Sequence, residues 1–177
     1  PGLDDPTLVV QFVNTDLATL AGSEAYGEYE WTSWLAVFGT LSYVEGRDRT
    51  RGLRGAFDNP PFSNFAPREP LPGIAPFDSR VGLRFQEPDE ARRWAVEFSA
   101  RIVDNQDRVA SSLLEKETPG FTTYDLRGYW QATDRLLLIA GVENLTDKHY
   151  REHLDLRTGY GVYQPGRSFY FGTELQY

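Results

Sequence analysis

The sequence contains neither cysteine nor methionine among its 177 residues. Without cysteine the chain has no disulfide bonds, no thiolate metal ligands and no cysteine nucleophile. Because the chain begins at Pro1 and has no methionine, we expect a further segment upstream. A secretory signal would lie in that segment, since no basic stretch followed by an apolar run opens the sequence.

Basic charge and long apolar runs are also scarce. The 18 Lys and Arg residues are outnumbered by 26 Asp and Glu, which gives a net charge of -8. Binding to nucleic acid needs clustered cations that neutralise phosphates, so nucleic acid is excluded as a partner. The longest apolar run extends from Leu136 to Val142 and is far shorter than the roughly 20 residues of a membrane-spanning helix.

Motifs of catalysis are missing as well. The sequence has no Gly-rich phosphate loop, no nucleophile elbow and no Cys/His cluster. We therefore expect no enzyme activity and no resident cofactor.

What the sequence does contain is a period of two in hydrophobicity, repeated from end to end. In one stretch Trp94, Val96 and Phe98 alternate with Ala95 and Glu97, so one face is apolar and the other polar. This alternation is typical of β-strands that have different surroundings on their two faces. The fold class is therefore all-β.

Alternating segments bounded by turn residues predict about seven antiparallel strands. Their expected ranges are 17–31, 34–45, 78–87, 94–104, 120–131, 135–146 and 167–177, with residues 8–13 as part of an eighth. A hairpin centred near Glu90 would place Arg84 opposite Glu97, which is a favourable cross-strand pair.

The connections between these strands alternate between short and long. Short turns are expected at Thr32-Ser33, Pro88–Arg93 and Thr133-Asp134, and long loops at Gly46–Phe77, Asn105–Pro119 and Lys148–Pro165. Outer-membrane barrels have short periplasmic turns and long extracellular loops. Aromatic residues at the short-turn end favour the same interpretation, because Trp and Tyr prefer membrane interfaces. They are Trp31, Trp34, Trp94, Tyr129, Trp130 and Tyr177.

Two segments of the last third form a recognisable pattern. An Asn-Leu-x-Asp-Lys-x-Tyr segment closes the penultimate strand, and Pro-Gly-Arg opens the last one. The residues concerned are Asn144, Leu145, Asp147, Lys148, Tyr150, Pro165, Gly166, Arg167 and the terminal aromatic Tyr177. This pattern resembles the C-terminal signature of TonB-dependent outer-membrane receptors.

The resemblance implies an antiparallel transmembrane β-barrel segment of seven or eight strands, the last third of a barrel of about 22 strands. Residues 1–177 would be the C-terminal part of the barrel, with the plug domain and the TonB box upstream. The implied function is active uptake of a scarce nutrient across the bacterial outer membrane, such as an iron-siderophore chelate or cobalamin. The implied partners are the TonB-ExbB-ExbD complex, the barrel-assembly machinery, outer-membrane lipid and the small nutrient ligand.

Charged residues of the polar face are expected to line the barrel lumen, where they would contact water and the plug. They are Glu24, Glu28, Arg84, Glu97, Arg101, Asp125, Arg127, Glu143 and Glu174. His149 and His153 lie in a long loop and are candidate ligand contacts. The same segment matches the His-x-x-Glu-His zinc motif, but that motif requires a helix and none is expected here.

Two other interpretations remain open. A small complete outer-membrane barrel of eight strands could serve adhesion or wall anchoring. A soluble ligand-binding barrel of the lipocalin type would instead turn its apolar face inward and expose the charged one.

Overall fold

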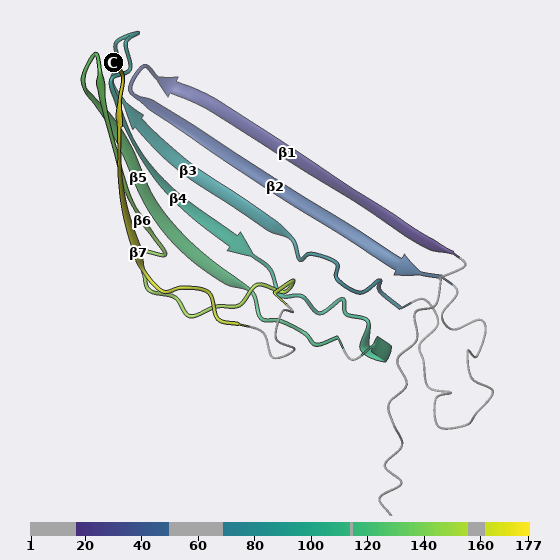
Figure 1. The fold of residues 1–177 in the computed structure, drawn as a ribbon. Coiled ribbons are helices and arrows are strands. Elements are labelled where there is room, and N and C mark those ends of the chain that lie inside the picture. The colour runs from purple at the N-terminus through teal and green to yellow at the C-terminus, as the bar shows by residue number, and fades with distance from the viewer. Residues whose placement is uncertain (1–16, 50–68, 114, 156–161) are drawn as a thin grey trace, which may run out of the picture.

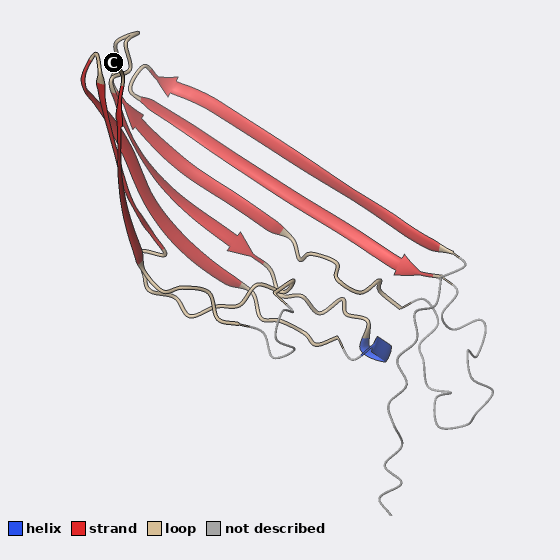
Figure 2. Ribbon diagram, in the orientation of Figure 1, coloured by secondary structure: helices blue, strands red, loops and turns tan. Residues whose placement is uncertain are grey.

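The computed structural model describes residues 17–49, 69–113, 115–155 and 162–177, which form one antiparallel sheet of seven strands. The strands are neighbours in chain order, and adjacent strands are antiparallel (Figure 1). They are β1 (Ala18–Thr32), β2 (Leu35–Asp48), β3 (Asp78–Gln86), β4 (Trp94–Val103), β5 (Phe121–Thr133), β6 (Leu136–Glu143) and β7 (Ser168–Leu175). In the described residues the helical structure is a single 3₁₀ turn, η2 (Ser111–Leu113) (Figure 2). The seven predicted strands are confirmed, and the eighth, at residues 8–13, falls outside the described residues.

Two strand ends differ from the prediction by three residues, and the others agree to within two. β2 continues to Asp48 instead of ending near residue 45, because Arg47 and Asp48 still pair with Thr19 and Ala18 of β1. β6 ends at Glu143 instead of residue 146, because Asn144 adopts a left-handed backbone with φ of 52°. A residue in that conformation cannot continue an extended strand.

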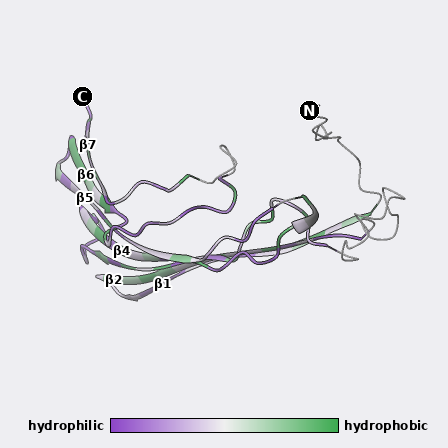
Figure 3. Ribbon diagram, turned by 90° about the horizontal axis from the view of Figure 1, so that it is seen from below, coloured by the Kyte–Doolittle hydropathy of each residue, from purple (hydrophilic) through white to green (hydrophobic). Residues whose placement is uncertain are grey.

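The sheet is curved, and the long loops lie over its concave side (Figure 3). Apolar side chains alternate onto the convex face, where Val81 is 50% exposed, Val96 41% and Phe98 39%. The other face carries buried polar residues, among them Gln86 and Ser99. This distribution contradicts a lipocalin-type barrel, in which the apolar side chains would fill the concave side.

The predicted β3–β4 register is confirmed, since Arg84 pairs with Glu97 and their side chains form an ion pair of 2.6 Å. Phe38 of β2 lies on the same concave face, against Gly82 of β3. A side chain at Gly82 would overlap the Phe38 ring, so the close packing of these strands depends on glycine.

All short turns lie at one end of the sheet, together with the C-terminus (Figure 1). The turn between β3 and β4 is clamped by Arg93, whose side chain and backbone N–H both donate to Glu87. These hydrogen bonds hold the pKa of the Glu87 carboxyl below its usual range.

The prediction that the aromatic residues at this end lie at the membrane interface needs one correction. Trp94 and Trp130 pair on the convex face, and Trp34 stacks on Phe85 with ring centroids 6.1 Å apart. Tyr129 instead lies on the concave face, because it pairs with Ala95 there. Its hydroxyl donates to the Arg92 carbonyl at 3.0 Å, so it closes the adjacent turn from inside.

The sheet formed by the described strands is open, with β1 and β7 as its edges. A complete eight-stranded barrel would close on itself and leave no such edges. The described strands therefore have the form of a barrel fragment. None of the described helical segments is long and apolar enough to cross a membrane.

We expect Phe171→Arg in the full-length protein to destabilise the inserted barrel by about 2 to 4 kcal/mol, because it places a cation on the lipid-facing side of a strand. Phe171 is 70% exposed on the convex face, opposite Ala140. The measurement is the heat-modifiable fraction of the protein in isolated outer membranes.

The matched control is the adjacent Gly172→Ser, which points to the concave side. A Cβ at Gly172 meets no atom within 4 Å, so we expect near wild-type insertion. If the Phe171→Arg variant inserts normally and the Gly172→Ser variant fails to insert, the assignment of the two faces is reversed.

Candidate functional site

The described loop segments are held together by the buried side chain of Glu115. Its Oε1 accepts hydrogen bonds from the backbone N–H of Gly73 at 2.7 Å, and its Oε2 accepts from the N–H of Ala110 at 2.6 Å. His153 Nε2 lies 3.2 Å from the same carboxylate, and His153 Nδ1 lies 2.9 Å from the Thr118 hydroxyl. Three loops are thereby joined into one assembly at the long-loop end of the sheet.

A second buried side chain supports this assembly. Gln106 is fully buried, and its side-chain amide donates to the carbonyl of Ile74. Its backbone pairs with Thr118 through two hydrogen bonds of 2.9 and 3.1 Å. Buried polar groups that are satisfied in this way rigidify the segments they connect.

The Asn144 segment forms a compact clasp after β6. The Asn144 side chain accepts from the Lys148 N–H at 2.8 Å and donates to the Lys148 and Pro165 carbonyls at 2.9 and 3.4 Å. Its backbone N–H donates to Asp125 of β5 at 3.0 Å. Asparagine tolerates the left-handed backbone that this position requires.

Asp147 completes the clasp from the other side of the loop. It also has a left-handed backbone, with φ of 55°, and its Oδ1 accepts from the Arg167 N–H at 2.9 Å. Gly166 lies so close to this oxygen that a Cβ would overlap it. The signature residues thus connect the end of β6 with the start of β7, across the intervening loop.

Tyr150 and Leu145 have different surroundings in the same segment. The Tyr150 ring packs against Phe121 of β5, with centroids 4.1 Å apart. Burial, followed by the nearby Glu152 carboxylate, raises the pKa of Tyr150, so its phenol stays protonated. Leu145 is 37% exposed, and its N–H donates to the Tyr124 carbonyl at 2.7 Å.

On the wall of the sheet, four charged side chains form a ladder across β1, β3, β4 and β5. Arg84 lies between Glu28 at 2.5 Å and Glu97 at 2.6 Å, and Arg127 forms an ion pair with the other oxygen of Glu97. Each charge has an opposite charge beside it. The four charged side chains of this ladder therefore neutralise one another and need no partner from another domain.

A second group of charges lies nearer to the loops. Arg101 contacts Asp78 and Glu152, each at 2.6 Å, so it attaches the loop after β6 to the wall. Arg80 and Asp125 form a looser pair at 3.4 Å. The Arg80 side chain remains 36% exposed and is available to a further anion.

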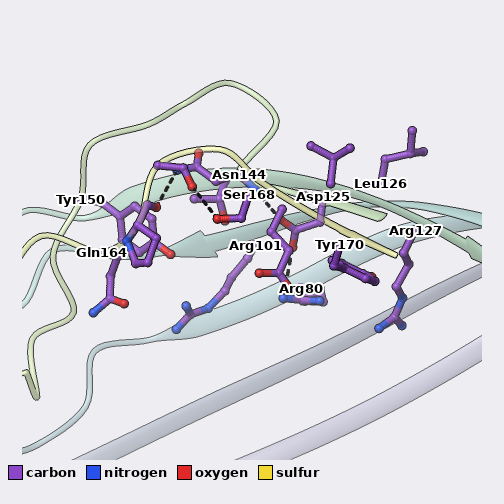
Figure 4. A pocket seen from close by; sticks show the side chains of 15 residues that line it. Arg80, Arg101, Asp125, Leu126, Arg127, Asn144, Tyr150, Gln164, Ser168 and Tyr170 are labelled. Carbon is purple, nitrogen blue, oxygen red and sulfur yellow. Dashed lines mark hydrogen bonds and ion pairs between the residues drawn. The ribbon is translucent and has the colours of Figure 1, made fainter. Parts of the chain in front are cut away.

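These residues surround a cavity of about 360 Å³ on the concave side. Figure 4 shows Asp125 beside Arg80 on the strands, with Tyr150 and Gln164 contributed by the loop. The lining is mainly polar and includes Arg80, Arg101, Asp125, Arg127, Glu143, Asn144, Tyr150, Gln164, Ser168 and Tyr170. A cavity of this composition suits a polar solute that hydrogen-bonds to several groups at once.

The expected lumen charges all lie on this concave face by strand register, but they differ in their contacts. Glu28, Arg84, Glu97, Arg101, Asp125 and Arg127 are in ion pairs. Glu174 accepts a hydrogen bond from the Gln176 side chain at 3.3 Å. Among the described residues no partner is found for Glu24 of β1 or for Glu143, which lines the cavity.

The two loop histidines do not share a site. The side chain of His153 is 2% exposed and both ring nitrogens have partners, so a role in contacting ligand fits His149 alone. His149 is exposed beside the Tyr163 ring, with centroids 5.9 Å apart. Glu152 of the zinc-like motif is bound by Arg101. In the described part of the chain no three His, Asp or Glu side chains are grouped to hold a metal ion.

Comparison with protein families matches residues 1–145 to the TonB dependent receptor-like β-barrel. The chain belongs to the TonB-dependent receptor family. Proteins of this family are receptors of the outer membrane of Gram-negative bacteria, and this chain is part of such a barrel. The clasp residues after 145, with Pro165, Gly166, Arg167 and Tyr177, lie beyond the matched range. No curated protein matches the chain.

Solved structures give the same fold. The copper transporter OprC is 26% identical, with a TM-score of 0.71 over 89% of this chain. The ferric yersiniabactin uptake receptor FyuA from Yersinia pestis is 15% identical over 89% of the chain with a TM-score of 0.63, and the siderophore receptor PiuA from Acinetobacter baumannii is 15% identical over 90% with a TM-score of 0.60. The chain spans 23% of the length of OprC and of FyuA, and 22% of PiuA.

We expect Asn144→Ala to destabilise the folded receptor by about 1 to 3 kcal/mol, because it removes a buried side chain that bonds to the Lys148 N–H and to two backbone carbonyls. Asn144→Asp keeps the acceptor for the Lys148 N–H and loses the donor, so its effect should be smaller. Both are measured as a shift in the denaturant midpoint of purified receptor in detergent.

Thr146→Ala is the control, since Thr146 is exposed in the same turn. If Asn144→Ala and Thr146→Ala shift the midpoint equally, the clasp does not stabilise the last hairpin.

Proposed function

We propose that this chain is the C-terminal part of a receptor that imports a scarce nutrient across the outer membrane, driven by the TonB-ExbB-ExbD complex. The observation that carries the proposal is the match of residues 1–145 to the receptor barrel family. The plug domain and TonB box are proposed to lie upstream, since the chain corresponds to 23% of the length of OprC.

The concave wall supports this proposal through its charge pattern. The ladder centred on Arg84 is satisfied within the wall, so it provides a hydrated surface that does not grip a neighbouring domain. Glu24, Glu143 and the exposed part of Arg80 remain for reversible contacts. A plug that must move during transport is best held by few and exposed ion pairs, each worth at most about 1 kcal/mol.

The loop assembly supports a binding role at the outer mouth of the barrel. Glu115 and Gln106 fix the loops from inside, so the assembly can present a preformed surface to a ligand. A preformed surface binds with a smaller entropic penalty than one that must be ordered. His149 and the cavity beside Tyr150 lie at the edge of this assembly and are the proposed contacts.

For the cargo we propose a metal chelate such as an iron-siderophore complex, with cobalamin as the second choice. The described cavity offers guanidinium, carboxylate, amide and phenol groups, which hydrogen-bond to the polar rim of a chelate. Soft metal ions prefer thiolate and thioether ligands, and this chain contains no cysteine or methionine. A bare Cu(I) ion therefore lacks its preferred sulfur ligands in this part of the receptor.

The test is uptake of labelled cargo by cells that carry or lack the full-length gene. The panel consists of several ⁵⁵Fe-siderophore complexes, labelled cobalamin and ⁶⁴Cu, each with and without a proton uncoupler. We expect receptor-dependent uptake of a chelate that the uncoupler abolishes. Receptor-dependent uptake that the uncoupler leaves unchanged would contradict TonB coupling, and receptor-dependent uptake of ⁶⁴Cu alone would contradict the proposed cargo.

The orientation of the barrel gives a separate prediction. Glu117 is exposed in a long loop, whereas Asp89 is exposed in a short turn at the opposite end of the sheet. We expect Glu117→Cys in the full-length receptor to react with a membrane-impermeant maleimide on intact cells.

Asp89→Cys is the paired control and should react after the outer membrane is permeabilised. Labelling of Asp89→Cys alone on intact cells would show that the barrel is inserted in the opposite direction.

A further inference from the structure

The β1–β2 hairpin extends beyond the rest of the sheet at the long-loop end (Figure 1). β3 begins at Asp78, which pairs with Ser42, so the last residues of β2 have no strand on that side. A loop covers them instead: Leu71 N–H donates to the Gly46 carbonyl at 3.0 Å, and Asp48 N–H donates to the Glu69 carbonyl at 2.9 Å.

Arg108 crosses to the convex side over this covered strand. Its guanidinium donates to the Val44 carbonyl at 2.9 Å and to the Tyr43 hydroxyl at 3.2 Å, and lies 4.9 Å from the centre of the Tyr43 ring. Successive residues of β2 alternate between the two faces of the sheet. Val44 is on the concave face, so Tyr43, which pairs with Ser23 of β1, is on the convex face. One arginine from a distant loop is thus fixed at the outer wall of the barrel.

Arg47 and Arg49 lie on the same convex face, at the end of β2. Arg47 is 53% exposed and forms an ion pair of 2.5 Å with Glu45, while Arg49 donates to the Thr19 hydroxyl at 3.3 Å. A hollow of about 180 Å³ separates Arg47 from Arg108, with Pro70 and Ile74 among its walls. Three guanidinium groups and one carboxylate give this patch a net positive charge.

The height of the patch follows from strand geometry. A strand rises about 3.3 Å per residue and tilts by about 40° in an outer-membrane barrel. Measured from Leu35, Tyr43 then lies about 20 Å up the membrane normal and Arg47 about 30 Å. The apolar band of such barrels is about 25 Å tall. Tyr43, with the Arg108 guanidinium bonded to it, lies near the outer edge of this band, and Arg47 and Arg49 lie above it.

We propose that Arg47, Arg49 and Arg108 form a binding site for the phosphorylated headgroup of a glycolipid in the outer leaflet. The site continues directly from the lipid-facing side chains of Val37 and Leu41, so the acyl chains of the same molecule can lie along β2. Guanidinium groups pair well with phosphate oxygens, and the ion pair with Glu45 orients Arg47 at the edge of the hollow. This site is separate from the lumen and from the proposed cargo contacts.

The test uses purified full-length receptor in detergent, titrated with a diphosphorylated glycolipid and followed by native mass spectrometry. We expect the double variant Arg47→Gln/Arg108→Gln to weaken lipid binding by at least about tenfold, because each cation near an anionic membrane surface contributes several-fold. The matched control, Arg93→Gln/Arg135→Gln, removes the same charge at the short-turn end and should bind like wild type. Equal binding by the double variant and wild type would overturn the proposal.

A second measurement compares lipids on the unaltered receptor, so it does not depend on how the variants fold. Removal of both phosphates from the glycolipid should weaken binding to wild type by a similar factor. Equal affinity for the dephosphorylated lipid would overturn the proposal. Inorganic phosphate should not displace the lipid at millimolar concentration, and complete displacement would identify a free-phosphate site instead.

Discussion

Hydrogen bonding of the backbone in a medium without water is the constraint on which the rest of this structure depends. Inside the hydrocarbon layer each peptide group needs a partner, and an antiparallel ladder supplies one between neighbouring strands. The ladder fixes a period of two, so one set of side chains faces lipid and the other faces the lumen. Val81 and Val96 on one face, with Arg84 and Glu97 on the other, follow from that single rule.

The same rule concentrates charged side chains on the concave wall. Most of these charges are then stabilised by an opposite charge beside them. Cross-strand neighbours on this face come within ion-pair distance, and Arg84 lies between two carboxylates from strands on either side of β3 in space. Where every charged side chain has an ion-pair partner, the wall offers no free charge to another domain or to a ligand. Glu143, without a partner among the described residues, and the loosely held Arg80 line the cavity that we propose as a contact for a plug or a ligand.

The segment predicted to be the family's C-terminal signature has a structural explanation in this chain. Asn144 and Asp147 are residue types that tolerate a left-handed backbone, and their short side chains bond to backbone groups within reach. Gly166 lets the returning chain approach Asp147, and Tyr150 fills the space against Phe121. The segment therefore closes the base of the loop between β6 and β7 and brings the last strand into register.

The sequence by itself determined the strands, their order, their faces and the Arg84–Glu97 register, because a period of two and short turns are local features. It did not show that β2 extends to Asp48, since that depends on pairing with β1. Nor did it separate buried His153 from exposed His149, which differ in the loops that pack around them. The crossing of Arg108 to the outer wall was likewise decided by tertiary structure, because it joins residues 65 positions apart in the chain. Contacts between loops depend on how distant segments pack, and the hydrophobic pattern of a sequence carries no record of that packing.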